Sequence, residues 1–125
     1  MERAIARIDL GAVRANCERL RTELGEARLC AVVKADGYGH GADQIAEAAL
    51  AGGASSFAVA TAGEARLIGR RFQHVPLLTM GALGVEELDT VLAAGSEVAV
   101  WGEDFLAVLA DRARAARRPA VRLPA

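Results

Sequence analysis

Short apolar runs alternate along this chain with segments in which apolar residues recur at helical spacing. The runs begin about 18 to 28 residues apart, which is the spacing of tight strand–helix units. Because they are almost continuously apolar, they are typical of parallel strands buried on both faces. The predicted strands are Leu29–Val33, Phe57–Ala60, Val75–Met80, Glu97–Trp101 and Ala120–Leu123.

The segments between the runs carry helix start and stop signals. Thr61-Ala62-Gly63-Glu64 has the spacing of a capping box, and Gly52-Gly53 and Gly95 follow apolar-periodic stretches as helix stops. Glu103 and Asp104 suit the positive N-terminal end of a last helix. Besides the helix that opens at the capping box, the predicted helices are Leu10–Leu24, Ala42–Ala51, Val85–Ala94 and one from Glu103 to about Arg117.

Repeated strand–helix units indicate an α/β fold, either a closed barrel or an open doubly wound sheet. Every unit is short and similar, which favours the barrel. A complete (β/α)8 TIM-type barrel needs about 250 residues, whereas 125 residues supply about four units plus a fifth strand. We therefore expect residues 1–125 to be one incomplete barrel domain, half of a barrel.

Composition narrows the possible partners. Hydrophobic residues make up 53% of the chain and charged residues 25%, with a formal net charge of −1. This balance favours neither nucleic acid nor an anionic membrane surface, and no apolar run approaches the roughly 18 residues of a membrane span. The N-terminal segment lacks a secretory hydrophobic core, so we expect a cytoplasmic protein. Cys17 and Cys30 have no metal-ligand spacing and are predicted to be buried free thiols, and no metal site is expected.

The candidate chemistry lies where the first strand ends. Lys34 closes that strand, and strand C-termini form the ligand-binding edge in a barrel and in an open sheet alike. Apolar neighbours disfavour the charged ammonium, and a neutral amine can attack an aldehyde. From spacing alone, a solvent-exposed lysine that merely begins a loop remains the alternative.

A glycine-rich turn follows Lys34. Gly37, Gly39 and Gly41 permit positive φ angles and close approach of a ligand, and their N–H groups together with a helix N-terminus suit a phosphate. Tyr38 stands four residues after Lys34, so its hydroxyl could reach the other end of one ligand, although a ring packed on the rim is an alternative. Asp36 and His40 are predicted to order the turn or to cap the next helix, and His74 to lie at the opposite, non-catalytic edge.

The segment Ala31-Val32-Val33-Lys34-Ala35-Asp36-Gly37-Tyr38-Gly39-His40-Gly41 resembles the pyridoxal 5′-phosphate (PLP) attachment motif of the alanine racemase family. The flanking segments are also similar to the family. They include Ile8-Asp9-Leu10 with Asn16, Ala51-Gly52-Gly53-Ala54, Phe57-Ala58-Val59-Ala60, Glu64-Ala65 and Pro76-Leu77-Leu78-Thr79-Met80-Gly81. The resemblance extends from about Arg3 to Leu123.

The resemblance implies a PLP-dependent isomerase that interconverts L- and D-alanine, with an N-terminal barrel, a C-terminal β domain and a homodimeric assembly. Lys34 matches the lysine that holds PLP as a Schiff base and acts as the base on one face of the substrate. Tyr38 matches the tyrosine that binds the cofactor phosphate, and Met80 falls at a strand end that lines the cofactor pocket. The implied role is the supply of D-alanine for the cell wall.

Other parts of the family pattern are not found in these residues. The family takes its second base from a tyrosine of the partner subunit, but Tyr38 is the only tyrosine here, and Pro124 falls where the fifth strand of the family leads to a lysine. We therefore expect the N-terminal part of a racemase, with the C-terminal β domain absent and with negligible activity alone. A non-catalytic PLP-binding module, a remnant that does not fold stably and a fragment of a broad-specificity amino-acid racemase are the alternatives.

Overall fold

A single parallel sheet organises the computed structural model, which describes residues 3–118 and 121–122. Within these residues the strands lie side by side in sequence order, and every neighbouring pair is parallel. They are β1 (Cys30–Val32), β2 (Ser56–Val59), β3 (Leu77–Thr79), β4 (Ser96–Ala99) and β5 (Val121–Arg122). A doubly wound sheet reverses its strand order at a switch point, and this order does not reverse. The arrangement is that of half a barrel, as predicted.

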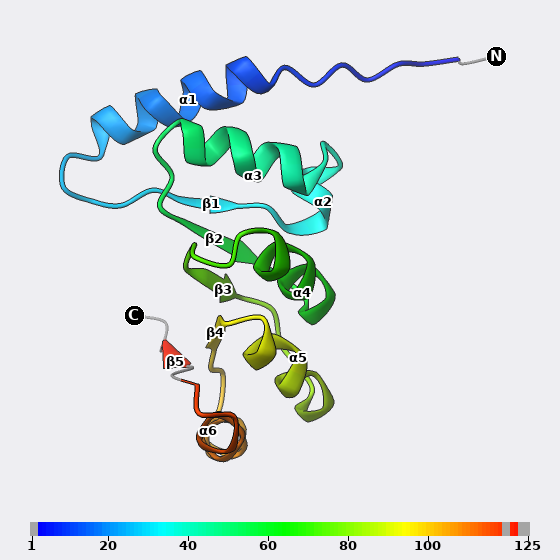
Figure 1. The fold of residues 1–125 in the computed structure, drawn as a ribbon, viewed down its shortest axis with the longest axis vertical. Helices are drawn as coiled ribbons and strands as arrows, with labels where there is room; N and C mark the ends of the chain where they lie inside the picture. The colour runs from blue at the N-terminus through cyan, green and yellow to red at the C-terminus, as the bar shows by residue number, and fades with distance from the viewer. Residues whose placement is uncertain (1–2, 119–120, 123–125) are drawn as a thin grey trace.

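The helices follow the strands along the outside of the sheet. Figure 1 shows α3, α4 and α5 on one side of the strands and α1 lying across α3 at one end of the molecule. The helical elements are α1 (Leu10–Glu23), α2 (Lys34–Tyr38), α3 (Ala42–Ala51), α4 (Ala62–Arg71), the 3-10 turn η1 (Val85–Glu87), α5 (Leu88–Ala93) and α6 (Glu103–Ala116). No helix in the described residues is long and apolar enough to cross a membrane.

Most element boundaries agree with the sequence pattern. Helix α3 has the predicted bounds, and the capping box at the start of α4 forms, with the Thr61 hydroxyl accepting from the Glu64 N–H at 3.1 Å. Helix α6 ends in a left-handed Arg117, not in a glycine. Strand β4 stops before Trp101, whose side chain is 68% exposed, so the predicted strand was too long there. Of the predicted last strand, Ala120 and Leu123 lie outside the described residues.

The hydrophobic core lies between the sheet and its helices. Alternate strand residues face the helices, and among these Phe57, Val59 and Val98 are fully buried. The helices contribute Ile68, Leu88, Val91, Leu92 and Leu109. The polar Thr79 is also buried there, and its hydroxyl lies 2.7 Å from the Ser96 hydroxyl, so both groups are satisfied.

The other face of the sheet is less covered, which corrects two predictions. Val32 on the edge strand β1 is 37% exposed, so β1 is not buried on both faces. Cys30 lies on the same face two residues earlier and is exposed, although we predicted a buried thiol. Cys17 on α1 is half-buried, and this burial raises the pKa of its thiol.

Candidate functional site

Lys34 lies where the chain leaves β1, at the carboxyl edge of the sheet. The preceding residue, Val33, is 1% exposed, and its N–H donates to the Ala58 carbonyl at 2.9 Å, which fixes the backbone up to the lysine. The Lys34 side chain itself is partly buried. If the β1–β2 register is continued by two residues and the β2–β3 register by one, Lys34, Ala60 and Met80 come into one row across the three strands. The structure therefore places Lys34 and Met80 at the same edge, as predicted.

The segment after Lys34, labelled α2 in Figure 1, is a left-handed turn. Gly37, Gly39 and Gly41 have the positive φ angles that glycine permits, at 63°, 82° and 94°. The sequence did not predict that Ala35, Asp36 and Tyr38 also have positive φ angles, of 51°, 54° and 58°. Each non-glycine residue in this region costs roughly 1–2 kcal/mol, so the surrounding structure must impose the conformation.

Hydrogen bonds close the turn on itself and attach it to α3. Gly37 N–H donates to the Val33 carbonyl at 3.1 Å, and Gly41 N–H donates to the Asp36 carbonyl at 2.9 Å. The Asp36 carboxylate accepts from the N–H of Ala42, the first residue of α3, at 2.9 Å. The capping role predicted for Asp36 is therefore confirmed. The capping role considered for His40 was wrong, because within residues 3–118 and 121–122 the imidazole makes no hydrogen bond.

The turn brings the two predicted cofactor residues together. Lys34 Nζ lies 5.9 Å from the centroid of the Tyr38 ring, and the Tyr38 side chain is 59% exposed. A Cβ added at Gly39 would meet no atom within 4 Å, so the space beside the turn is open. A primary amine and a phenol hydroxyl at one strand edge can bind the aldehyde and the phosphate of one molecule. These residues fit PLP.

Glu64 ties the turn to the rest of the sheet, a role that the sequence did not reveal. One carboxylate oxygen accepts from the Ala35 N–H at 2.8 Å, and the other from the N–H groups of Ala60 and Thr61 at 2.8 and 3.0 Å. Partial burial opposes ionisation, but these hydrogen bonds outweigh it and lower the pKa of the Glu64 carboxyl. The capping-box spacing identified the bonds within α4. The contact with Ala35, 29 residues earlier, has no local sequence signal.

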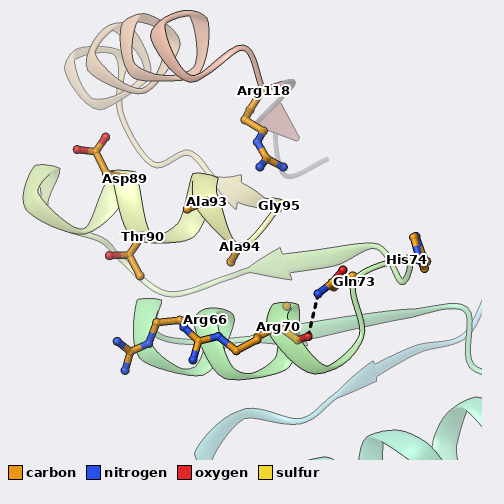
Figure 2. Close-up of a pocket in the computed structure, with 11 residues that line it drawn as sticks. Arg66, Arg70, Gln73, His74, Asp89, Thr90, Ala93, Ala94, Gly95 and Arg118 are labelled. Carbon is orange, nitrogen blue, oxygen red and sulfur yellow. Dashed lines mark hydrogen bonds between the residues drawn. The ribbon is translucent and has the colours of Figure 1, made fainter.

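A large cavity of about 710 Å³ lies away from Lys34, between α4 and α5 (Figure 2). Its lining includes Arg66, Arg70, Asp89 and His74. Because His74 precedes β3 whereas Lys34 follows β1, the two residues lie at opposite edges of the sheet, as predicted. A second cavity, of about 510 Å³, lies behind the turn and is lined in part by Asp36, Glu64 and Leu67. No cluster of metal-ligating side chains occurs in the part of the chain that the structure describes.

Comparison with known proteins agrees with this geometry. The family profile described as "Alanine racemase, N-terminal domain" matches residues 8–122. This chain belongs to the alanine racemase family. Among solved structures, the alanine racemase of Streptomyces coelicolor A3(2) is 38% identical, with a TM-score of 0.84 over 94% of this chain and 32% of that one. The fold is thus the N-terminal half of the racemase barrel.

Curated alanine racemases match in sequence as well. That of Symbiobacterium thermophilum is 41% identical over 96 residues, which are 77% of this chain and 26% of the relative. That of Mycobacterium ulcerans is 39% identical over 111 residues, which are 89% of this chain and 29% of the relative. The chain therefore spans less than a third of the length of these racemases.

Proposed function

We propose that this chain is the PLP-binding part of an alanine racemase, an isomerase that interconverts L- and D-alanine. The observation that carries the proposal is the left-handed turn, which sets the Lys34 amine beside the Tyr38 ring at the carboxyl edge of a half-barrel. PLP, when bound, supplies an electron sink that makes the Cα proton of an amino acid acidic.

In this proposal Lys34, Tyr38 and Met80 each have a separate role in binding the cofactor or in proton transfer. Lys34 would hold PLP through the aldehyde of the cofactor, and its Nζ would accept or return a proton on one face of the substrate Cα. The Tyr38 hydroxyl would donate a hydrogen bond to a phosphate oxygen of the cofactor. Met80 lies in the same row of strand ends, where its side chain can border the cofactor.

Racemisation also needs an acid or base on the opposite face of Cα. Tyr38 is the only tyrosine in the 125 residues, and the proposal assigns it to the phosphate. We therefore propose that the second group comes from a partner subunit in a homodimer, that a C-terminal β domain carries it, and that residues 1–125 are the first part of the barrel domain. The same proposal places the protein in the cytoplasm and its product in the supply of D-alanine for the cell wall.

Attachment of PLP to Lys34 can be tested directly because Lys34 is the only lysine in the sequence. The 125-residue chain is incubated with PLP, reduced with borohydride, digested and analysed by mass spectrometry. We expect a reduced PLP adduct on the peptide that contains Lys34, and its loss in Lys34→Arg. The α-amino group of Met1 provides an internal reference for non-specific labelling.

The labelling result also distinguishes part of a racemase from a non-catalytic PLP-binding module. Labelling at Met1 but not at Lys34 would contradict the proposal. Labelling at Lys34 without racemisation would be the behaviour of a PLP-binding module, the second candidate, which the single tyrosine favours for the chain alone.

A further inference from the structure

The peptide bond that follows Lys34 is held by a carboxylate from another element. Ala35 N–H, which belongs to that peptide bond, donates to Glu64 Oε1 at 2.8 Å. Glu64 Oε2 accepts from Ala60 N–H, at the end of β2, and from Thr61 N–H, just before α4. The Glu64 side chain therefore connects the segment that follows β1 to the segment that follows β2.

We propose that Glu64 is a positioning residue for Lys34, and that it fixes the direction in which the lysine amine leaves the sheet. The inference rests on the proposed attachment of PLP to Lys34. On the amino side of the lysine, Val33 N–H donates to the Ala58 carbonyl at 2.9 Å. On its carboxyl side, the Glu64 bond fixes the plane of the next peptide. The backbone on both sides of Lys34 is thus tied to β2 or to α4.

The three hydrogen bonds that Glu64 accepts from Ala35, Ala60 and Thr61, which we call the Glu64 bridge, require a carboxylate. Three N–H groups point at its two oxygens, and hydrogen bonds to an ionised acceptor are about twice as strong as neutral ones. A glutamine has one carbonyl oxygen, and its NH2 group would face an N–H donor at one end of the bridge. Glu64→Gln therefore keeps the size of the side chain but breaks either the contact with Ala35 or the contact with Ala60 and Thr61.

Loss of the bridge should act on Lys34 and Tyr38 together. Ala35 has a φ of 51°, which an alanine adopts only when its surroundings impose it. Without the Glu64 contact, Ala35 can relax toward negative φ, and the turn that carries Tyr38 then moves relative to the lysine. Reactions between positioned groups are sensitive to such shifts, since a displacement of about 1 Å can cost a factor of about 100 in rate.

A matched control exists elsewhere in the chain. Glu87 makes the same kind of bond to an N-cap backbone as Glu64 does: its Oε2 accepts from the Gly84 N–H at 2.7 Å at the start of η1. It contacts none of the residues 34–41 through a hydrogen bond in the described part of the chain. Glu87→Gln thus weakens a comparable helix-capping hydrogen bond and leaves the hydrogen bonds of residues 34–41 unchanged.

The experiment compares the rate at which PLP attaches to Lys34 in the wild-type chain, Glu64→Gln and Glu87→Gln, each quenched with borohydride at a series of times. We expect Glu64→Gln to slow the labelling of Lys34 by about 10-fold to 100-fold relative to the Met1 amine, as misplacement of a reacting group predicts. Glu87→Gln should keep the wild-type ratio. Circular dichroism at the assay temperature shows whether each variant is folded.

Equal Lys34:Met1 ratios in Glu64→Gln and wild type would overturn the inference, as would an equal loss in both variants. Amide hydrogen exchange tests it without PLP: Glu64→Gln should deprotect Ala35 and weaken the nuclear Overhauser contact between the Lys34 side chain and the Tyr38 ring. If the wild type attaches no PLP, the proposed function fails, whereas unchanged Ala35 protection and ring contact would show that Glu64 does not position the lysine.

Discussion

At the residue scale, five consecutive positive φ angles set the geometry of the site. From Ala35 to Gly39 the backbone winds left-handed, with φ between 51° and 82°. This turn leaves the centroid of the Tyr38 ring 5.9 Å from Lys34 Nζ. The unfavourable backbone conformation is therefore part of what brings the two proposed cofactor-binding residues together.

Substitution of three glycines should separate backbone conformation from steric contact. A Cβ at Gly37 meets the Ala42 backbone and Ile45 at 3.3 Å and also requires a φ of 63°. Gly39 requires a φ of 82° but has no neighbour within 4 Å, and Gly102 has neither constraint. We expect Gly39→Ala to lower the free energy of unfolding by about 1–2 kcal/mol, Gly37→Ala to lower it further, and Gly102→Ala to change it least.

Urea unfolding of the three variants measures these differences. Equal stability of Gly37→Ala and Gly102→Ala would contradict the requirement for the left-handed turn.

At the element scale, α4 is both a core helix and an anchor for the site. Its first turn carries Glu64, whose bonds to Ala60 and Thr61 complete the helix cap and whose bond to Ala35 crosses to β1. Its inner face carries Ala65 and Ile68 into the core. Packing of α4 thus fixes the position of the carboxylate, and the carboxylate in turn holds the lysine turn.

The stability supplied by Glu64 should depend on pH. Its pKa in the folded protein lies below the usual 4.5, since hydrogen bonds to the carboxylate outweigh the effect of burial. Folding therefore favours the ionised form, and its stabilisation is fully present above about pH 4.5 and is lost as the pH falls through the lower folded pKa. We expect the Tm of the wild type to exceed that of Glu64→Gln at neutral pH and the gap to narrow below pH 4.5. Thermal unfolding at a series of pH values measures this gap, and a constant gap would contradict the assignment.

The sequence predicted elements that depend on local signals. Helix α3 has the predicted bounds because glycines flank it, and the capping box located the start of α4. Lys34 could be placed because a strand end is visible as the end of an apolar run. The left-handed conformation of Ala35 and the hydrogen bond that its N–H donates to Glu64 were not predicted, because each depends on a contact between residues far apart in sequence. Exposure of Cys30 was missed because the pattern does not show which strand lies at the sheet edge.

At the scale of the whole molecule, one lysine stands at the carboxyl edge of the sheet, and one face of the edge strand β1 is exposed. Five parallel strands in sequence order form half of a barrel, and Lys34 stands at the end of its first strand. The alanine racemase N-terminal domain profile matches residues 8–122, and the proposed function assigns PLP binding to this part of the chain. Half of a barrel can carry the lysine and the residue proposed to bind the phosphate, but inversion at Cα requires an acid or base on each face of the substrate.

The 125-residue chain with PLP should therefore interconvert D- and L-alanine at a negligible rate, even when Lys34 is labelled. Lys34 can exchange a proton on one face, but the only tyrosine, Tyr38, stands beside it on the same turn and cannot serve the opposite face. General acid–base catalysis contributes about 100-fold to 10,000-fold per group, so loss of the second group should lower the rate by about that factor relative to a complete racemase. Chiral chromatography of alanine after incubation measures it, with Lys34→Arg as the background. A rate well above that background, with inversion starting from either enantiomer, would show that the chain holds a second base and would contradict the proposed role of the partner subunit.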